Sequence, residues 1–292
     1  MTQRNGFMLN LIDLHTHSRA SDGSDTPARI VQYACEKGLK GIALTDHDTV
    51  SGLPEFMEET KKCGIIGVPG VEISTRLFAK ELHIVGLFIN PETPELSELL
   101  ERMRAGREKR NREIIHKLNV LGYEITYDEL LQVAGGESVG RPHIGAVLLR
   151  KGYFKTMHEV FVQCLKRGCR AYVPRELPDS AEAVKVIHAA GGLAIWAHPV
   201  SGQAGERGYA KKMLRKLMDF GIDGVETNYS MFSEHQTQMM HEIAEAAGVL
   251  KSGGSDYHGV NQPGIDLGTG SGSLAVPFEF LERMMEARQC AR

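Results

Sequence analysis

Short apolar runs alternate with helical patterns along the first ninety residues. The runs that predict strands are Leu9–Leu14, Leu39–Thr45, Ile65–Val68 and Glu81–Phe88. Between them, Ala28–Lys37 and Gly52–Cys63 have the spacing of amphipathic helices, and Thr26-Pro27 is a typical helix start. Strands that alternate with helices in this way predict an α/β fold with parallel strands and right-handed crossovers.

The pattern changes in the middle of the chain. A single long helical pattern covers Leu96–Leu121, and shorter ones follow at Thr126–Ala134, His143–Lys151 and Thr156–Gly168. We interpret residues 96–174 as a small helical insertion, and residues 1–95 and 175–292 as the α/β domain that it interrupts. Residues 101–175 hold 15 Lys and Arg against 8 Asp and Glu, a net charge of +7, so the rest of the chain carries −10. The insertion is therefore expected to have a basic face, with a solvated surface as the simpler alternative for any single Arg.

The alternation of strands and helices resumes after residue 174. The expected helices are Ser180–Ala190, Gly208–Phe220, Phe232–Ala247 and Phe278–Arg288, and the expected strands are Leu193–Ala197, Gly224–Thr227 and Val249–Gly253. In parallel folds of this kind the reactive side chains gather at the carboxyl ends of the strands.

Composition narrows the class of protein. A chain of 292 residues with 42% hydrophobic residues can bury a substantial core, and a net charge of −3 argues against a globally basic nucleic-acid binder. The five cysteines are scattered without a C-x-x-C pair, which favours reduced thiols. No signal peptide is apparent, and no apolar run approaches the roughly 18 residues of a membrane span. We expect a soluble cytoplasmic protein without an obligate protein partner.

Histidines and carboxylates collect at or near the ends of the predicted strands. Each has a structural alternative: His83 as a core histidine, His198 as a strand end, Asp256 as a turn residue. Taken together, these structural alternatives are less convincing, because at least five segments bring such residues to one edge of the predicted sheet. The nine candidates are His15, His17, Asp22, His47, Glu72, His83, His198, Asp256 and His258. The histidines within helical patterns are interpreted as structural or surface residues.

Nine imidazoles and carboxylates exceed the needs of one zinc ion and suit two or three divalent ions, such as Mn²⁺, Fe²⁺ or Zn²⁺. Glu72 could bridge two of them. Clustered ions can hold a water as hydroxide and neutralise a phosphoryl group. Cations must then bind the phosphate. Arg141, in Gly140-Arg141-Pro142-His143 before a predicted helix, is the most suggestive one, with an ordinary helix start as the alternative.

Other candidates for substrate contact are less specific. They are Arg170, Arg175 and Lys166 in or after the insertion, and Asn228 and Tyr229 after a strand. Glu226 is expected to support a ligand instead of binding a metal.

In these residues the chain resembles the PHP (polymerase and histidinol phosphatase) superfamily of metal-dependent phosphoesterases. The matching stretches are His15-Thr16-His17, Ser21-Asp22-Gly23, Thr45-Asp46-His47-Asp48, Glu72, His83, Ala197-His198-Pro199 and Gly254-Ser255-Asp256-Tyr257-His258. The resemblance implies a distorted (β/α)7 barrel with three metals. It implies that His15, His17, Glu72 and Asp256 bind one ion, that Glu72 bridges to a second on His83 and His198, and that Asp22, His47 and His258 bind a third.

Within the superfamily, the insertion resembles that of small bacterial enzymes that act on nucleotides, where it is a lid over the substrate. The resemblance carries over Arg141 and His143 as phosphate contacts. The ligand set suits two or three divalent ions, with Mn²⁺ as the first expectation. We expect hydrolysis by a metal-bridging hydroxide, while Arg141 and neighbouring cations stabilise the charge. His198 or His258 is expected to protonate the leaving oxygen if metal does not fully engage it. The preferred substrate is a nucleoside 3′,5′-bisphosphate. The alternatives are 5′→3′ exoribonuclease activity on short RNA, histidinol-phosphate phosphatase activity, and a non-catalytic metal or nucleotide sensor.

Overall fold

The computed structural model describes residues 10–201 and 207–290, and Leu9, which was expected to begin the first strand, lies outside them. Within these ranges one sheet runs in the order β7-β6-β5-β4-β3-β2-β1-β8. Its strands are β1 (Leu11–Asp13), β2 (Gly41–Leu44), β3 (Ile66–Leu77), β4 (Lys80–Leu87), β5 (Leu193–Trp196), β6 (Gly224–Tyr229), β7 (Leu250–Gly254) and β8 (Val276–Pro277). Every expected strand is present, and β8 is additional.

The sheet curls until its first and seventh strands meet. The main-chain N–H of Leu14, just after β1, donates to the carbonyl of Gly253 on β7 at 3.1 Å. An isolated parallel bridge joins Thr16 to Tyr257 a few residues further on. Strands β1 to β7 therefore form a nearly closed, distorted barrel, and β8 pairs with β1 in antiparallel fashion. This confirms the expected α/β barrel.

The expectation that all strands are parallel is wrong at β4. This strand runs antiparallel to both of its neighbours, β3 and β5. The chain passes from β3 to β4 through the tight turn at Phe78, whose φ is 56°, and a hairpin this short can join only antiparallel strands. The third strand was expected to end at Val68, but β3 continues through Pro69 and Gly70 to Leu77. The other adjacent pairs from β1 to β7 are parallel.

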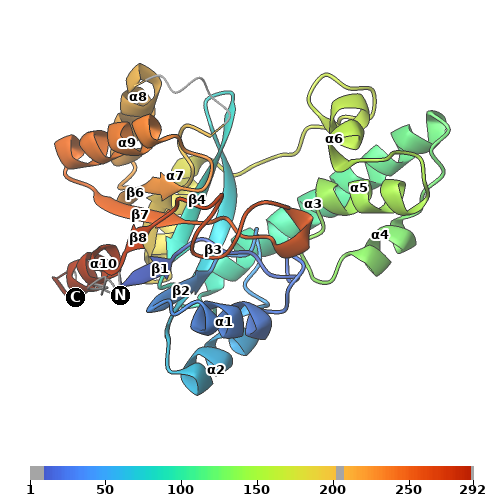
Figure 1. The fold of residues 1–292 in the computed structure, drawn as a ribbon. Coiled ribbons are helices and arrows are strands. Elements are labelled where there is room, and N and C mark those ends of the chain that lie inside the picture. The colour runs from blue at the N-terminus through green and yellow to red at the C-terminus, as the bar shows by residue number, and fades with distance from the viewer. Residues whose placement is uncertain (1–9, 202–206, 291–292) are drawn as a thin grey trace.

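Helices cover the outside of the barrel (Figure 1). These are α1 (Pro27–Glu36), α2 (Leu53–Cys63), α7 (Ser180–Ala189), α8 (Arg207–Met218), α9 (Glu234–Ala247) and α10 (Phe278–Cys290). The helix α10 packs at the end of the barrel where the strands begin: a β-carbon on Gly41, the first residue of β2, would lie only 2.8 Å from Leu281 of α10. The opposite end, where the parallel strands finish, is thus left for the polar side chains.

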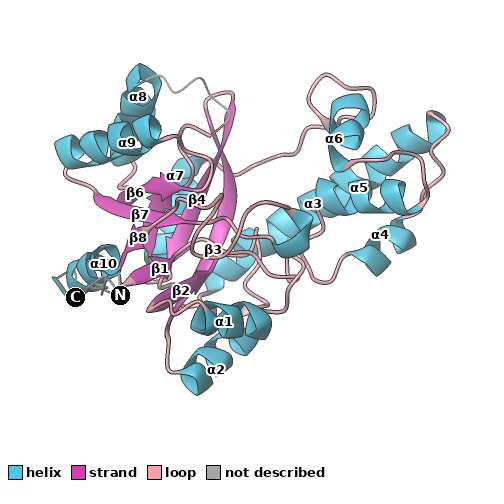
Figure 2. Cartoon of the chain, viewed as in Figure 1, coloured by secondary structure: helices cyan, strands magenta, loops and turns pink. Residues whose placement is uncertain are grey.

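The insertion projects to one side of the barrel as a group of helices (Figure 2). It comprises α3 (Pro94–Val120), α4 (Tyr127–Val133), α5 (Arg141–Arg150), α6 (Met157–Val160) and a π-helical turn at Phe161–Leu165. A 3-10 turn at Gly259–Asn261 follows β7. The helices of the insertion have their own apolar core, which includes Ile114, Leu118, Ile144 and Leu148. The fourth expected helix of the insertion, Thr156–Gly168, ends early at Leu165. No helix in the described residues is both long and apolar enough to cross a membrane.

Candidate metal centre

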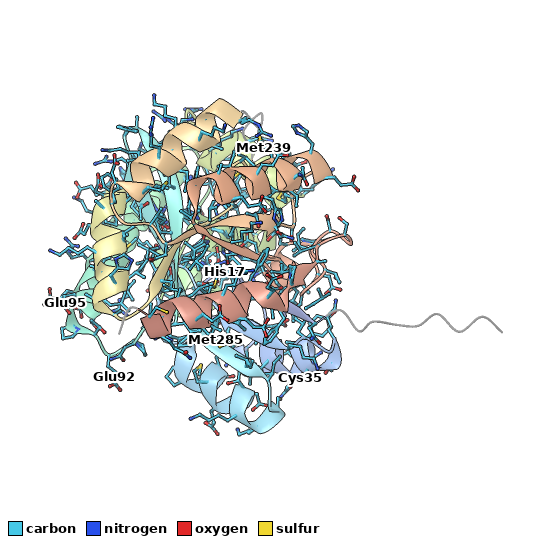
Figure 3. All side chains as sticks on the ribbon, turned by 90° about the vertical axis from the view of Figure 1, so that its left-hand side faces the viewer. His17, Cys35, Glu92, Glu95, Met239 and Met285 are labelled. Carbon is cyan, nitrogen blue, oxygen red and sulfur yellow. The ribbon has the colours of Figure 1, made fainter. Side chains whose placement is uncertain are left out.

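The seam between β1 and β7 brings the first and last candidate ligands together. The N–H of His17 donates to the carbonyl of Tyr257, and the N–H of Asp256 donates to the carbonyl of His15, both at 2.9 Å. As a result, Nε2 of His17 lies 3.1 Å from Oδ1 of Asp256. Both histidines are fully buried. His17 lies near the middle of the surrounding helices (Figure 3).

The carboxylate of Glu72, on β3, is the centre of the cluster. Its Oε1 lies 2.8 Å from Nδ1 of His83 and 2.9 Å from Nε2 of His198. Its Oε2 lies 2.9 Å from Nδ1 of His47 and 3.2 Å from Nε2 of His17. Burial alone would raise the pKa of Glu72, but His47 and the other imidazoles hold that pKa well below its usual range. A fully buried carboxylate with an imidazole on each side is suited to bridge two cations.

A third corner of the cluster consists of Asp22, after β1, and His258, after β7. Nε2 of His258 lies 3.3 Å from Oδ1 of Asp22. Nδ1 of His258 is 2.8 Å from the carbonyl of Asp256, a group that can only accept a hydrogen bond. Nδ1 must therefore carry the proton, and the lone pair of a neutral His258 is on Nε2, which faces Asp22.

The described residues contain three groups of side chains whose ligand atoms lie within 4.8 Å of one another. These groups are His17, Asp22, His47 and His258; His15, His17, Glu72 and Asp256; and His47, Glu72 and His83. The structure thus brings together eight of the nine expected ligands, and the ninth, His198, contacts Glu72. The grouping differs from the expected one because His17 and His47 each belong to two of these three groups. One ring nitrogen binds one ion, so each of them must serve a single ion in a loaded site.

Several polar atoms at this centre are buried without a hydrogen-bond partner. They are His15 Nε2, His17 Nδ1 and Nε2, Asp22 Oδ1, His47 Nδ1 and Glu72 Oε2. Leaving one such atom unsatisfied costs about 1–3 kcal/mol, so a whole cluster of them is costly unless another group binds it. All of the donors are imidazole nitrogens or carboxylate oxygens, which suit borderline and hard divalent ions. The residues present therefore fit a multinuclear metal site.

A second layer of carboxylates orients these ligands. Oε1 of Glu226, on β6, lies 2.7 Å from Nδ1 of His15, and Oε2 accepts the N–H of His198 at 2.6 Å. Tyr229, on the same strand, donates its hydroxyl to Oδ2 of Asp256 at 2.8 Å. Glu226 thus supports ligands, as the sequence suggested. Such partners fix the tautomer and the direction of the ligating groups.

Two further buried acids fasten the ligand-bearing loops. Asp13 accepts the N–H groups of Ser255 and Gly268, and Asp46 accepts hydrogen bonds from both the N–H and the hydroxyl of Ser18. Asp46 also accepts the hydroxyl of Ser21, beside Asp22, at 2.6 Å. Their role depends on hydrogen bonds to residues distant in the sequence, so the sequence alone does not distinguish these acids from metal ligands.

A cavity of about 180 Å³ opens directly on the metal centre. Its lining includes the candidate ligands Asp22, His47 and His83 together with four arginines. The arginines are Arg107, Arg110, Arg141 and Arg175. Glu81, Ser74, Pro142 and Phe161 complete the lining. Guanidinium groups that line a small cavity beside candidate metal ligands favour an anionic ligand that contacts both.

Only some of the residues expected to contact substrate line this cavity. Arg141 and Arg175 line this cavity, whereas Arg170 is exposed and is not part of the lining. His143 is 7% exposed, and its Nδ1 accepts the N–H of Gly140 at 2.9 Å. Asn228 lies elsewhere, where its Nδ2 donates to the carbonyl of Ala275 and its Oδ1 faces His241.

Sequence reasoning missed Arg107 and Arg110, both on α3. A signal was present, because the buried face of α3 reads Leu96, Leu99, Leu100 and Met103, and then Arg107, Arg110 and Asn111 before Ile114. Polar residues thus replace apolar ones at the positions that a helical periodicity assigns to the core. Buried arginines at such positions indicate that this part of α3 faces a polar site.

Known proteins resemble this chain in sequence and in fold. The PHP domain family matches residues 13–169. A 5′-3′ exoribonuclease of Haemophilus influenzae is 37% identical over 86% of this chain and 91% of its own length. A 3′,5′-nucleoside bisphosphate phosphatase of Chromobacterium violaceum is 34% identical over 88% of this chain and 90% of its own. The crystal structure of a metal-dependent phosphoesterase from Bifidobacterium adolescentis superposes with a TM-score of 0.84 at 27% identity, covering 95% of this chain and 96% of the other.

Proposed function

This chain belongs to the PHP domain family and is a metal-dependent phosphoesterase, and we propose that it hydrolyses phosphate esters of nucleotides, with the 3′-phosphate of nucleoside 3′,5′-bisphosphates as its first substrate. The observation that carries this proposal is a small cavity lined by both candidate metal ligands and four arginines. The relative from Chromobacterium violaceum supports the same substrate.

We assign metal binding to all nine candidate ligands: His15, His17, Asp22, His47, Glu72, His83, His198, Asp256 and His258. Two or three divalent ions fit this set of nitrogen and oxygen donors, and Mn²⁺ is our first assignment, with Fe²⁺ and Zn²⁺ as alternatives. When bound, the ions activate water as a nucleophile and neutralise the phosphoryl oxygens. Glu226, Tyr229 and the other second-layer groups keep the ligands in place.

The arginines bind and orient the phosphate. Arg107 lies on α3, Arg175 directly follows the insertion, and Arg141 is at the start of α5. Guanidinium groups pair with phosphate oxygens through two parallel hydrogen bonds, so they can hold the ester in line for displacement. We propose that residues 96–174 are a substrate-binding domain that covers this side of the site.

The leaving oxygen needs a proton. In His258 both ring nitrogens are engaged, Nδ1 with the carbonyl of Asp256 and Nε2 toward Asp22. In His198, Nε2 faces Glu72, and Nδ1 makes no hydrogen bond to any described residue. We therefore prefer His198 for donating the proton, from Nδ1, in the form of the site in which no metal binds its Nε2.

The test is hydrolysis of adenosine 3′,5′-bisphosphate by the purified protein with Mn²⁺. We expect inorganic phosphate and adenosine 5′-phosphate as products. His83→Ala should bind less metal by elemental analysis, and its turnover should fall roughly a thousandfold, because a metal ion supplies several kcal/mol of transition-state stabilisation. His116→Ala, at an exposed position on α3, is the control. Absence of phosphate release from the wild-type protein loaded with metal would refute the proposal.

The second candidate is 5′→3′ exoribonuclease activity on short RNA, which the relative from Haemophilus influenzae favours. A labelled RNA trimer distinguishes the two activities. Stepwise release of mononucleotides supports the exonuclease, and loss of a terminal phosphate alone opposes it. Including histidinol phosphate in the same assay tests a third substrate. Tight nucleotide binding without any turnover would indicate a sensor.

A further inference from the structure

The helix α8 is strongly basic on its exposed face. Its twelve residues include five cations and no acid. Two of these cations pair with neighbouring carboxylates. The other three, Lys211, Lys212 and Arg215, are exposed and form no ion pair within the described ranges. Lys211 and Lys212 lie one turn before Arg215, so the three charges share one side of the helix. They stand out because the chain outside residues 101–175 carries a net charge of −10.

The opposite side of α8 is not available to a partner. Ala210, Met213, Leu214 and Leu217 are buried and belong to the main apolar core. A helix that lies on a membrane needs a free apolar face beside its cations, and α8 has already buried its own. Its three unpaired cations therefore suit a hydrated polyanion, which charge alone can attract.

A second cavity connects the first turn of α8 to the metal centre. It has a volume of about 220 Å³, and its lining includes the candidate ligands His83 and His198 together with the aromatic side chains of Trp196 and Tyr209. Glu81 and His83 line both this cavity and the one with the four arginines, so the two cavities adjoin beside the metal centre. A ligand longer than one nucleotide can therefore extend from the metal centre toward α8.

The β3–β4 hairpin meets α8 at Tyr209. Nζ of Lys80 lies 4.1 Å from the centre of the Tyr209 ring. The tip of the hairpin rises past the ends of the other strands (Figure 1). Phe78, at this tip, is 64% exposed, and its φ of 56° is unfavourable for a bulky side chain. An exposed phenyl ring in a strained turn does not stabilise the protein itself, which indicates that a ligand contacts it.

We propose that Tyr209, Phe78 and the three unpaired cations of α8 form a binding surface for single-stranded RNA. Aromatic rings stack on bases while lysines and arginines follow the phosphate backbone, and this combination binds single strands of any sequence. The inference rests on the proposed function. The reacting phosphate lies at the metal centre, and the nucleotides beyond it, which a nucleoside 3′,5′-bisphosphate lacks, extend onto this surface.

The experiment compares adenosine 3′,5′-bisphosphate with a 5′-phosphorylated RNA hexamer as substrates of the protein loaded with Mn²⁺. The variant is the triple substitution Lys211→Gln, Lys212→Gln and Arg215→Gln. For the hexamer we expect kcat/KM to fall roughly tenfold, and for the bisphosphate we expect no change. The matched control carries the same change of charge at three exposed lysines elsewhere: Lys40→Gln, Lys61→Gln and Lys185→Gln. Equal losses for both substrates would overturn the inference and leave the proposed function intact.

Binding provides a readout without turnover. Fluorescence anisotropy of a labelled hexamer with hydrolysis-resistant phosphorothioate linkages measures its affinity for the protein loaded with Mn²⁺. In the triple variant the slope of log affinity against log salt should decrease by about 2, since each phosphate contact with a single strand contributes about 0.7. Phe78→Ser should weaken binding roughly tenfold by removing one stacked base, and it tests the surface independently if the triple variant does not fold.

Unchanged affinity in both variants would overturn the inference. The same holds if the wild-type protein binds vesicles that contain phosphatidylserine and not the hexamer, because the cations then serve a lipid surface. If the wild-type protein binds the hexamer through these residues but releases no phosphate from the bisphosphate, the proposed function is refuted and the RNA-binding surface stands.

Discussion

Nη1 of Arg175 lies 2.9 Å from Oδ2 of Asp48, and the same carboxylate oxygen accepts hydrogen bonds from Arg107. Asp48 belongs to the barrel, Arg107 to the first insertion helix, and Arg175 to the segment where the chain returns to the barrel. One buried side chain therefore joins both connections of the insertion to the loop that carries His47. Asp48 therefore positions the loop and these two arginines of the cavity together.

Asp48→Asn should destabilise the protein and weaken substrate binding. Breaking a buried ion pair leaves uncompensated charge and costs about 3–5 kcal/mol in the free energy of unfolding. Urea denaturation measures this loss, and steady-state kinetics should show an increase in KM. Glu108→Gln removes an exposed pair with Arg112 and should change the free energy of unfolding by less than about 1 kcal/mol. An equal effect of the two substitutions would contradict the role assigned to Asp48.

The same variant has a defined pH dependence. Burial alone would raise the pKa of Asp48, but Arg107 and Arg175 hold it well below the ordinary value. The stabilisation is therefore fully present above the ordinary pKa of about 3.9 and is lost as the pH falls toward the folded-state pKa. The difference in unfolding free energy between wild type and Asp48→Asn should be constant from pH 7 to pH 5 and shrink below about pH 4. A constant difference down to pH 3 would count against the ion pairs.

Metal binding should release protons. Burial opposes the charged form of His83 and of His258, but Glu72 raises the pKa of His83 to about 10, and Asp22 raises that of His258 to about 10. Both imidazoles are thus protonated at pH 7 without metal, and a ligating imidazole must be neutral. Titration of the metal-free protein with Mn²⁺ in a weakly buffered solution should acidify it, and affinity should fall as the pH is lowered from 8 to 6. Calorimetry in two buffers of different ionisation enthalpy counts the protons, and a count of zero would contradict the prediction.

Glu226→Gln should impair the site without removing a ligand. The substitution weakens the contact that orients His15 and the one to the N–H of His198. Loss of such a partner typically costs 10- to 100-fold in metal affinity or activity, so we expect a decrease of about that size in Mn²⁺ affinity by calorimetry. Glu245→Gln, on the exposed side of α9, is the control. Wild-type affinity in Glu226→Gln would show that His15 needs no such support.

Gly136→Ala should disturb the metal centre from within the insertion. A β-carbon at Gly136 would lie 2.3 Å from the carbonyl oxygen of Ala20, close to Asp22. Either the insertion or the Asp22 loop must shift, so we expect lower activity and weaker metal binding. Gly106→Ala, inside α3, meets no atom within 4 Å and should stabilise the helix by up to about 1 kcal/mol. Full activity in both variants would show that the insertion does not constrain the loop.

The gathering of the candidate ligands was predictable because each of them follows or lies in a segment whose strand character is evident from its apolar pattern. His15 and His83 could be assigned to one edge before their distances were known. Strand direction was less accessible. The β3–β4 hairpin has only Phe78 and Ala79 between its strands, and neither is a residue typical of tight hairpin turns, so the pattern did not reveal the reversal.

The arginine cavity was only partly predictable, because it depends on how the insertion packs on the barrel. Arg141 could be suspected from its local motif, and Arg175 from its charge. Arg107 and Arg110 are two among many cations on a long helix, and only the orientation of that helix distinguishes them from its solvated arginines. The same limit applies to Asp48, whose partners are 59 and 127 residues away in the sequence.

The seam between β1 and β7 has a consequence for biosynthesis. His15 and His17 leave the ribosome first, whereas Asp256 and His258 are translated only after the insertion and six further strands. His15 and His17 therefore lack the rest of the candidate ligand set until β7 pairs with β1 and closes the barrel. Metal acquisition should be a late, post-translational event, and a nascent chain halted before β7 should retain no ion with the affinity of the finished enzyme.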